Sequence, residues 1–469
     1  MPPELSAATV LSRGQRNTLL ALLLGLTALV AAKPLVGYGL SPITLVHAVI
    51  VTSAVTYVVY ESYQMMLAIV GFRRISPPAT KQLTDKELPT YSVLVPLYKE
   101  AAVLPTLIPA LAALDYPVEK LQILLVIEES DDVTRAALDG ITLGQAFEVV
   151  LINPSMPRTK PKACNIALER VWGELCTVYD AEDRPDPQQL RVAATAFRAH
   201  PDEVVCLQAE LSHWNPYTNW LTATFAAEYA LRYGPTMRGL DRLQVPIPLG
   251  GNSNHFRTAA LCELGAWDPY NLTEDADLGM RIARRGWVTH SIPSLTLEEA
   301  NSDVGNWIRQ RSRWIKGHVQ TWLVHMRQPR RLWKELGPKG FLGFQMVMGL
   351  PALGKILHPF IIAVTIASFL PGSGRSEAIF PPFIASLGLI TLIIATIMVI
   401  TQLVSACVMW KLYRCIPTAF TWHLYGMLMS VAAVKGIGQL MRPSRRFHWE
   451  LTKHGLVNEP GGPPATPLP

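Results

Sequence analysis

The sequence predicts an α/β domain with a parallel sheet, placed between membrane-spanning helices. Charged residues are dense between about Arg73 and Lys339 and sparse on either side, although the whole chain is 49% hydrophobic with a net charge of +6. Within the central region, short apolar runs alternate with longer helical stretches, as in sheets built from successive strand and helix units. We therefore expect one soluble domain with membrane segments at both flanks.

Two apolar stretches, 18–36 and 43–70, precede the domain. About 20 helical residues at roughly 1.5 Å each cover a hydrocarbon core of about 30 Å, so each stretch can cross a bilayer. A cleaved signal peptide is the alternative for the first, with Arg13 and Arg16 as its charged region. The second stretch follows at once, which favours a transmembrane hairpin over residues 1–72. Basic residues on both outer flanks predict a cytoplasmic domain over 73–339.

Residues 340–441 are apolar again. One crossing is expected within 341–370 and another over 383–410, whereas polar side chains interrupt 418–440. Basic residues directly after 441 predict a cytoplasmic tail, so the number of crossings after the domain must be even. We expect two crossings, with 341–353 and 418–440 lying in the interface as amphipathic helices.

The six cysteines include no C-x-x-C pair and no histidine at zinc spacing. Four fall in the predicted cytoplasmic region, so they are interpreted as reduced structural thiols without a metal. The chain has no G-K-[ST] phosphate loop and no basic array, and these absences argue against nucleic acid as a partner.

Five apolar runs are expected to form strands: 91–97, 121–127, 147–153, 175–179 and 204–211. Acidic residues follow three of them, with Glu100 after the first and Glu128 and Glu129 after the second. The fourth ends in the sequence Asp-Ala-Glu-Asp at 180–183. Ligands of such sheets bind beyond the carboxyl ends of the strands, so these acids mark the expected site.

The D-A-E-D sequence predicts a divalent metal. Asp180, Glu182 and Asp183 place three carboxylates within four residues, and they repel one another unless a cation holds them. Mg²⁺ or Mn²⁺ takes oxygen ligands and bridges a diphosphate, so the cluster is expected to hold a nucleotide diphosphate through its metal. Helix capping is the alternative, and it suits Asp131 or Asp132.

Two loops offer complementary chemistry. The basic loop 157–165 opens a helix, where backbone N–H groups and ammonium groups favour phosphate, although it could also be a solvated loop. At 250–254, two glycines permit close approach of a ligand, and Gly251 and Asn252 are candidates for contact with sugar hydroxyls. Trp267 could stack on a sugar ring or pack in the core. The aromatic residues of the predicted helix 219–233 are expected to be core.

Two further motifs follow in order, T-E-D at 273–275 and Q-x-x-R-W at 310–314. Acidic residues are also favoured at a helix N-terminus, and this is the alternative interpretation of T-E-D. The ordered pair, however, resembles the processive glycosyltransferases of family 2, the cellulose, hyaluronan and chitin synthase group. The resemblance implies a GT-A (Rossmann-like) catalytic domain in which Asp275, beside Glu274, is the general base. It places Gln310, Arg313 and Trp314 at the acceptor terminus.

The resemblance also implies donor and tail residues. Donor contacts fall on Glu100, Glu129, Lys162, Asp180 and Glu182. The chain departs from the family at two places, since D-A-E-D replaces D-x-D and Glu128-Glu129 replaces an aspartate. Which of Glu182 and Asp183 reaches the metal, and which of Glu128 and Glu129 reaches the nucleotide, stays open. Residues 442–458 resemble a gating loop, with Trp449, Thr452 and His454 at its motif positions, and 459–469 is expected to be disordered.

These expectations combine into one function. The chain is expected to be a multi-pass protein of the bacterial inner membrane that uses a UDP-sugar, with UDP-glucose as the default. By inversion it would extend a β-linked glycan and pass it across the bilayer, with export partners beyond the membrane. One alternative is a non-processive transferase that modifies a lipid carrier. Another, from a different class, is a transporter or an inactive scaffold of an export complex.

Overall fold

The computed structural model describes residues 2–36, 41–73, 82–369, 381–453 and 455. A mixed eight-stranded sheet organises the central domain, in the order β3-β2-β1-β4-β7-β6-β8-β5. The strands are β1 Tyr91–Leu97, β2 Leu121–Glu128, β3 Phe147–Ile152, β4 Leu175–Val178, β5 Arg184–Pro185, β6 Val204–His213, β7 Asn254–Arg257 and β8 Val288–Glu298. The predicted strands at 91, 121, 147, 175 and 204 are confirmed, each starting at the expected residue.

The sheet is parallel only in part. β3, β2, β1 and β4 pair in parallel, as expected. β7 then runs antiparallel to both β4 and β6, and it occupies the place between them. The expectation of an all-parallel sheet was wrong here because Asn254–Arg257, which had been interpreted as loop, completes the sheet. β2 is buried along its whole length, as a central strand covered on both faces must be.

Helices cover both faces of the sheet and flank the cavity described below. In the domain they are α3 Leu104–Ala112, α4 Asp132–Asp139, α5 Lys160–Leu168, α6 Gln189–Ala199, α7 Trp220–Leu231, α8 Met237–Arg242, α9 Thr258–Glu263, α10 Glu274–Arg284 and α11 Val304–His325. Local chemistry fixes several starts: Asp131 caps α4, Asn219 and Thr222 form a capping box at α7, and Asp303 caps α11. Between α7 and α8 the chain makes a π-helical segment, Arg232–Thr236.

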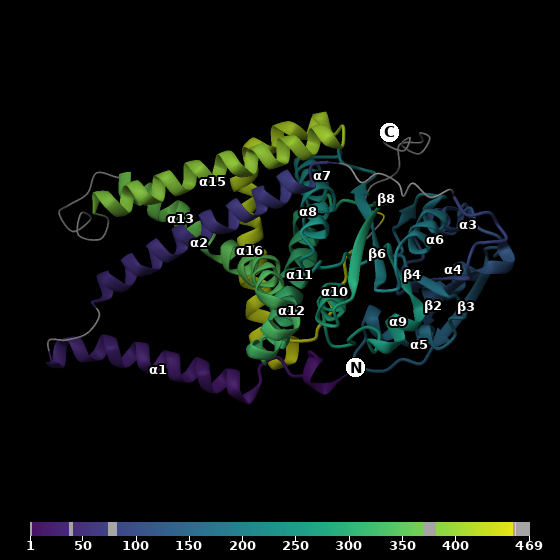
Figure 1. Cartoon of the computed structure of the whole chain (residues 1–469), viewed down its shortest axis with the longest axis horizontal. Helices are drawn as coiled ribbons and strands as arrows, with labels where there is room; N and C mark the ends of the chain where they lie inside the picture. Colours follow the sequence, from purple (N-terminus) through teal and green to yellow (C-terminus); the bar gives the residue numbers. More distant parts are fainter. Residues whose placement is uncertain (1, 37–40, 74–81, 370–380, 454, 456–469) are drawn as a thin grey trace.

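The remaining helices are α1 Arg13–Val36, α2 Pro42–Gly71, α12 Pro329–Phe344, α13 Leu350–Phe369, α15 Pro382–Met409 and α16 Trp422–Met441. Among the described residues, four helical stretches are long and apolar enough to cross a membrane: Ile43–Gly71, Pro329–Ala367, Pro382–Met409 and Tyr413–Met441. In Figure 1, α2, α13 and α15 project away from the sheet, while α16 runs across them beside α11. Residues 341–353, expected to form an interface helix, lie in a helical run that continues from α12, after a break at Gly337, through a π-helical turn into α13; their place relative to a membrane stays a prediction.

Candidate active site

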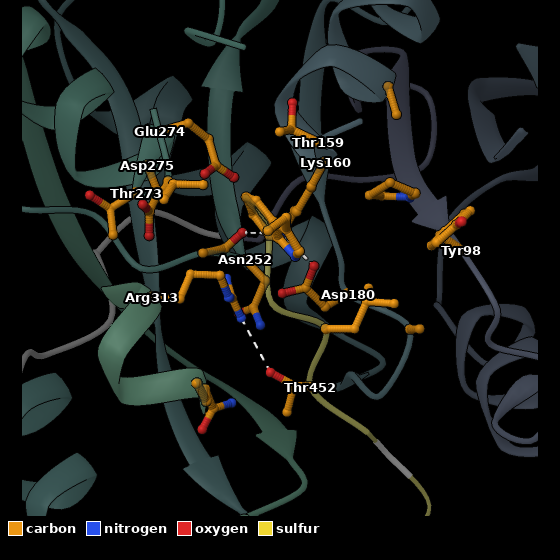
Figure 2. Close-up of a pocket in the computed structure, with 18 of the residues that line it drawn as sticks. Tyr98, Thr159, Lys160, Asp180, Asn252, Thr273, Glu274, Asp275, Arg313 and Thr452 are labelled. Atoms are coloured by element: carbon orange, nitrogen blue, oxygen red, sulfur yellow. Dashed lines mark hydrogen bonds and ion pairs between the residues drawn. The ribbon is translucent and has the colours of Figure 1, made fainter. Parts of the chain in front are cut away.

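A cavity of about 500 Å³ lies at the carboxyl edge of the parallel strands. Strand register explains its position, because β1, β2 and β4 end side by side and bring Glu100, Glu128 and Asp180 to the same edge. Figure 2 shows side chains from several elements converging on it, including Lys160 of α5, Asp275 of α10 and Arg313 of α11. The cavity thus gathers groups that are more than 200 residues apart in the chain.

Gly251 marks the centre of the cavity. A Cβ placed on Gly251 would lie 3.8 Å from both Asp180 Oδ2 and Asp275 Oδ2 and 4.0 Å from Lys160 Nζ. Lys160 Nζ also donates to Asp180 Oδ1 and, over 2.6 Å, to the carbonyl of Gly251. The predicted metal-binding acid and the predicted base therefore face one small volume, next to a backbone that has no side chain to fill it.

Lys160 is the main residue that the sequence interpretation missed. The predicted Lys162 is half-buried, donates to the carbonyl of Ser155 over 2.6 Å, and is not among the residues that line the cavity. Lys160 is the first residue of α5, so its side chain stands at the helix N-terminus that was expected to favour phosphate. Burial opposes its charge, but the carboxylates of Asp180 and Glu274 raise the pKa of Lys160 above its usual value.

The acids after β2 and β4 divide into two kinds. Glu128 lines the cavity, with Arg158 Nε 3.5 Å from its carboxylate, whereas Glu129 is exposed and outside the lining. Asp183 is fully buried, and its carboxylate accepts hydrogen bonds from the backbone N–H of Asp180 and the side-chain amide of Asn252. Asp183 thus holds the turn that presents Asp180, while Asp180 and Glu182 face the cavity.

The carboxylates near Asp180 and Glu182 disfavour one another's charge. Burial, followed by Glu182 and Asp180, raises the pKa of Glu100 to about 9. Burial likewise raises the pKa of Glu298 to about 8, against a hydrogen bond from Asn252. Among the described residues no three His, Cys, Asp or Glu side chains converge as a metal cage. Mg²⁺ commonly uses one or two carboxylates together with substrate phosphates, so Asp180 and Glu182 fit a divalent cation held in that way.

The T-E-D acids begin α10. Burial and then the Asp275 charge raise the pKa of Glu274 to about 8. Burial also raises the pKa of Asp275, opposed by the N–H of Ala276 and by the cations Lys160 and Arg232. One turn further on, buried Asp277 accepts hydrogen bonds from Arg281 Nε at 2.8 Å and His325 Nε2 at 2.9 Å. The bond from His325 ties α10 to the end of α11, while Arg281 belongs to α10 itself and donates onward to the carbonyls of Leu264 and Ala266.

The helix α11 also contributes to the cavity. Gln310, Arg313 and Trp314 all line it, and their role at an acceptor terminus stays a prediction. Asn252 lines it as well, while Trp267 does not: its indole is buried against Phe256 at a ring distance of 6.1 Å, so Trp267 packs in the core.

Four residues that also line the cavity were not singled out by the motifs: Tyr229, Arg232, Tyr233 and His318. Burial and the neighbouring Arg232 lower the pKa of His318 to about 3, so its ring is neutral. Its Nδ1 donates to the carbonyl of Trp314 over 2.8 Å, which makes Nε2 an acceptor nitrogen. In the sequence, only its position could have indicated that His318 faces the cavity, because it lies one turn beyond Trp314 on the same helix.

The C-terminal segment lies over the cavity. Trp449 and Thr452 line it, and the Arg313 guanidinium stacks on the Trp449 ring at 4.4 Å and contacts Thr452 Oγ1 at 3.4 Å. Glu450 anchors the segment by accepting from Lys435 at 2.7 Å and Gln439 at 2.8 Å on α16. His454, the third residue of the gating-loop resemblance, lies outside the described residues.

Comparisons with known proteins agree with this arrangement. The family described as "Glycosyltransferase like family 2" matches residues 89–317. A probable glycosyltransferase, YdaM, of Bacillus subtilis is 25% identical over 57% of this chain and 65% of its own length. The β-monoglucosyldiacylglycerol synthase of Synechocystis is 28% identical over 60% of this chain and 59% of its own length. The chain thus spans less than two thirds of these relatives.

A solved structure shares the fold. The mannosyltransferase PcManGT of Pyrobaculum calidifontis, in complex with GDP-Man and Mn²⁺, superposes with a TM-score of 0.54 at 19% identity, covering 84% of this chain and 99% of that one. The predicted GT-A architecture is thereby confirmed.

Proposed function

Residues 89–317 match the family described as "Glycosyltransferase like family 2", and from this similarity we propose that the chain is a membrane-bound, inverting and processive transferase that extends a β-linked glycan from a UDP-sugar. One observation carries the proposal. A single cavity is lined by the acids after the strands, by Asp275 and by the Q-x-x-R-W residues of α11. Such a gathering suits a donor and an acceptor that meet at one base.

The chemistry assigned to the chain is a direct displacement. Asp275 accepts the proton of an acceptor hydroxyl, whose oxygen then bonds to the anomeric carbon of the donor sugar. The bond from that carbon to the phosphate oxygen breaks, and the electron pair leaves with the nucleoside diphosphate. Attack opposite the leaving group inverts the configuration, so an α-linked donor gives a β-linked product. A general base of this kind contributes about 10²- to 10⁴-fold to the rate.

Lys160 and a divalent cation serve the leaving group in this proposal. Lys160 stands beside Asp180, where its ammonium group can meet the phosphates. Asp180 and Glu182 would hold Mg²⁺ or Mn²⁺, which supplies positive charge for the departing diphosphate. Glu128, with Arg158, is the acid that we assign to the nucleotide, because Glu129 faces solvent.

Processivity is supported by the setting of the acceptor end. α11 packs along α16 and also contacts α13, so the acceptor residues stand directly beside helices apolar enough to cross a membrane. A growing glycan would leave the cavity between the acceptor residues and these helices. On the resemblance to the synthase group we assign the protein to the bacterial inner membrane, with the bilayer, the growing glycan and export proteins as partners.

A second candidate function is transfer to a lipid. It is favoured by the similarity to a β-monoglucosyldiacylglycerol synthase, whose name gives a diacylglycerol as the sugar acceptor. The same nearness of the acceptor end to the apolar helices would admit a lipid hydroxyl. Product length separates the two functions.

The test is incorporation of labelled sugar by purified protein in detergent, with UDP-glucose, UDP-N-acetylglucosamine or GDP-mannose and Mg²⁺ or Mn²⁺. We expect polymeric product from one UDP-sugar, and Asp275→Asn should lower turnover by at least about 10²-fold while the protein still binds UDP. Asp132→Asn, at a side chain that is 90% exposed, is the matched control. Label in lipid-soluble material alone would establish the second candidate. Full turnover in Asp275→Asn would refute the assignment of the base.

A further inference from the structure

The residues before α1 pack against the catalytic domain. Ala7 is completely buried and Val10 is 5% exposed, although both belong to an irregular segment that follows a short 3-10 helix, Pro3–Leu5. The segment Pro3–Ser12, here called the strap, lies against residues 268–270 and the second half of α11. A hairpin that only anchors the protein in a membrane requires no contact with the domain. The packing of the strap on the domain therefore needs a separate explanation.

Asp268 connects the strap to the loop that leads to the base. Its buried carboxylate accepts hydrogen bonds from the N–H of Ala7, the hydroxyl of Ser6 and the N–H of Tyr270. The same carboxylate therefore holds both the strap and the backbone five residues before Asp275. Without the strap it would lose two of three donors in a buried position, which is costly for a charged group.

Arg327, just after α11, holds the other side of the strap. Its guanidinium donates to the carbonyls of Glu4 at 2.7 Å and Ser6 at 3.0 Å, and also to that of Thr9. None of these three carbonyls accepts a hydrogen bond within a strand or a helix. The planar guanidinium fork suits several carbonyls at once, so it fixes the course of the segment.

Gln320, buried on α11, joins the two sets of contacts. Its Nε2 donates to the carbonyl of Tyr270 at 3.0 Å and that of Ala7 at 3.5 Å, while its Oε1 accepts from the N–H of Leu272 at 3.4 Å. Thr321 Oγ1, next to it, accepts from Asn271 Nδ2 at 2.9 Å. Every residue from 270 to 272 is thus bonded to α11 through side chains beside the strap.

The loop continues directly into Thr273, where α11 approaches very closely. A Cβ on Gly317 would stand 2.6 Å from Thr273 Cγ2 and 2.7 Å from its backbone nitrogen. Asp275 follows at the second position of α10. Any shift of the loop on α11 is therefore transmitted to the base within two residues.

We propose that the strap is a positioning element for Asp275: with Asp268, Gln320 and Arg327 it clamps residues 268–273 onto α11 and so sets the base in the cavity. The inference rests on the proposed function for the role of Asp275. A displacement of about 1 Å can cost roughly 10²-fold in rate, so a clamp remote from the chemistry has a direct kinetic consequence.

The test uses the full-length protein with Arg327→Ala, which removes all three strap contacts of that side chain, and Asp268→Asn as an independent variant. We expect kcat to fall at least about tenfold, with the affinity for UDP unchanged within about twofold, because donor groups lie elsewhere in the cavity. Hydrogen exchange should rise at residues 268–278 and stay unchanged in the parallel strands. Arg327→Lys, which keeps donors for the carbonyls, should recover part of kcat.

Arg331→Ala is the matched control, because this arginine is 56% exposed and pairs with Glu335 rather than with the strap. Wild-type kcat and exchange in both Arg327→Ala and Asp268→Asn would overturn the proposal. Exchange that rose over the whole domain would also overturn it, since the contacts would then serve stability alone. If the wild type turned over no sugar donor, the proposed function would fail, and the local exchange result would still decide whether the strap clamps the loop.

Discussion

At the residue scale, a small number of side chains decide what the cavity can do, and one of them, Lys160, lies two positions before the lysine that the sequence predicted. Lys160 and Lys162 flank one proline, yet only Lys160 reaches Asp180 and Gly251. At the start of a helix, residues two positions apart point in directions about 200° apart. The sequence motif alone does not show which of the two lysines faces the site, whereas their positions relative to Asp180 at the end of β4 do.

The two lysines therefore form a matched pair for a prediction. Lys160→Met should weaken UDP binding in the presence of Mn²⁺ by about ten- to hundredfold, since a charge-assisted hydrogen bond contributes roughly 1.5–3 kcal/mol. Lys162→Met should leave it within about twofold, because Lys162 binds only the carbonyl of Ser155 at the surface. Calorimetric titration of UDP measures both. The reverse order of effects would restore Lys162 as the diphosphate ligand.

The raised pKa values of Glu100 and Glu298, about 9 and about 8, predict a pH dependence. Each folded-state pKa lies above the value of an unfolded glutamate, about 4.3, so each contribution to stability falls as pH rises through the window from there to about 8 or 9. A divalent cation can replace these protons. Its binding should therefore tighten between about pH 6 and pH 9 and release protons.

Titration of Mn²⁺ with UDP in buffers of different ionisation enthalpy measures this proton release. Glu100→Gln removes one titrating group and should flatten the pH dependence. An affinity for Mn²⁺ that is constant across the window in the wild type would contradict the placement of the cation beside these carboxylates.

At the scale of elements, α11 organises the site. It carries Gln310, Arg313 and Trp314 into the cavity, approaches Thr273 through Gly317, and supports both the strap and the C-terminal segment. Buried Lys316 on this helix donates to the carbonyls of Arg445 and His448, so the course of the tail is fixed from the same surface. The part of the tail that is held in this way thus forms part of the cavity wall.

The C-terminal segment is predicted to retain the bound nucleotide. Trp449→Ala removes the ring that stacks on Arg313, and together with Thr452→Ala it should raise KM for the donor by about five- to thirtyfold, the range of one to two lost contacts of about 1 kcal/mol each. Lys453→Ala, on an exposed side chain outside the cavity lining, is the control. Steady-state kinetics measures KM, and an unchanged value in the double variant would argue against a gating role.

At the scale of the whole molecule, both ends of the described chain touch the catalytic domain. The strap contacts residues 268–270, and the tail contacts Arg313 and Glu299. We therefore predict that both ends lie on the same side of the membrane as the domain and that an even number of crossings follows the domain, although three candidate helices do so. α16, which runs beside α11 across the direction of α15 in Figure 1, is the one expected to lie in the interface.

Labelling of cysteines in intact cells tests this topology. With a membrane-impermeant maleimide, Ser41→Cys and Phe383→Cys should react from outside, because each stands at the start of a helix that returns towards the domain. Ser444→Cys should react only after lysis, as should native Cys262, which is exposed on the catalytic domain and serves as an internal control. Reaction of Ser444→Cys from outside would require α16 to cross the membrane.

The sequence by itself determined the fold class, the starts of five strands, and the acids that follow them, because alternating apolar runs and strand-end polar residues are local signals. T-E-D and Q-x-x-R-W likewise indicated a glycosyltransferase before any contact was known. Only the tertiary structure decided that Lys160 rather than Lys162 faces Asp180 and that β7 enters the sheet. Contacts between segments hundreds of residues apart, such as Asp268 with Ala7, depend on how separate elements pack, and no local pattern in the chain encodes that packing.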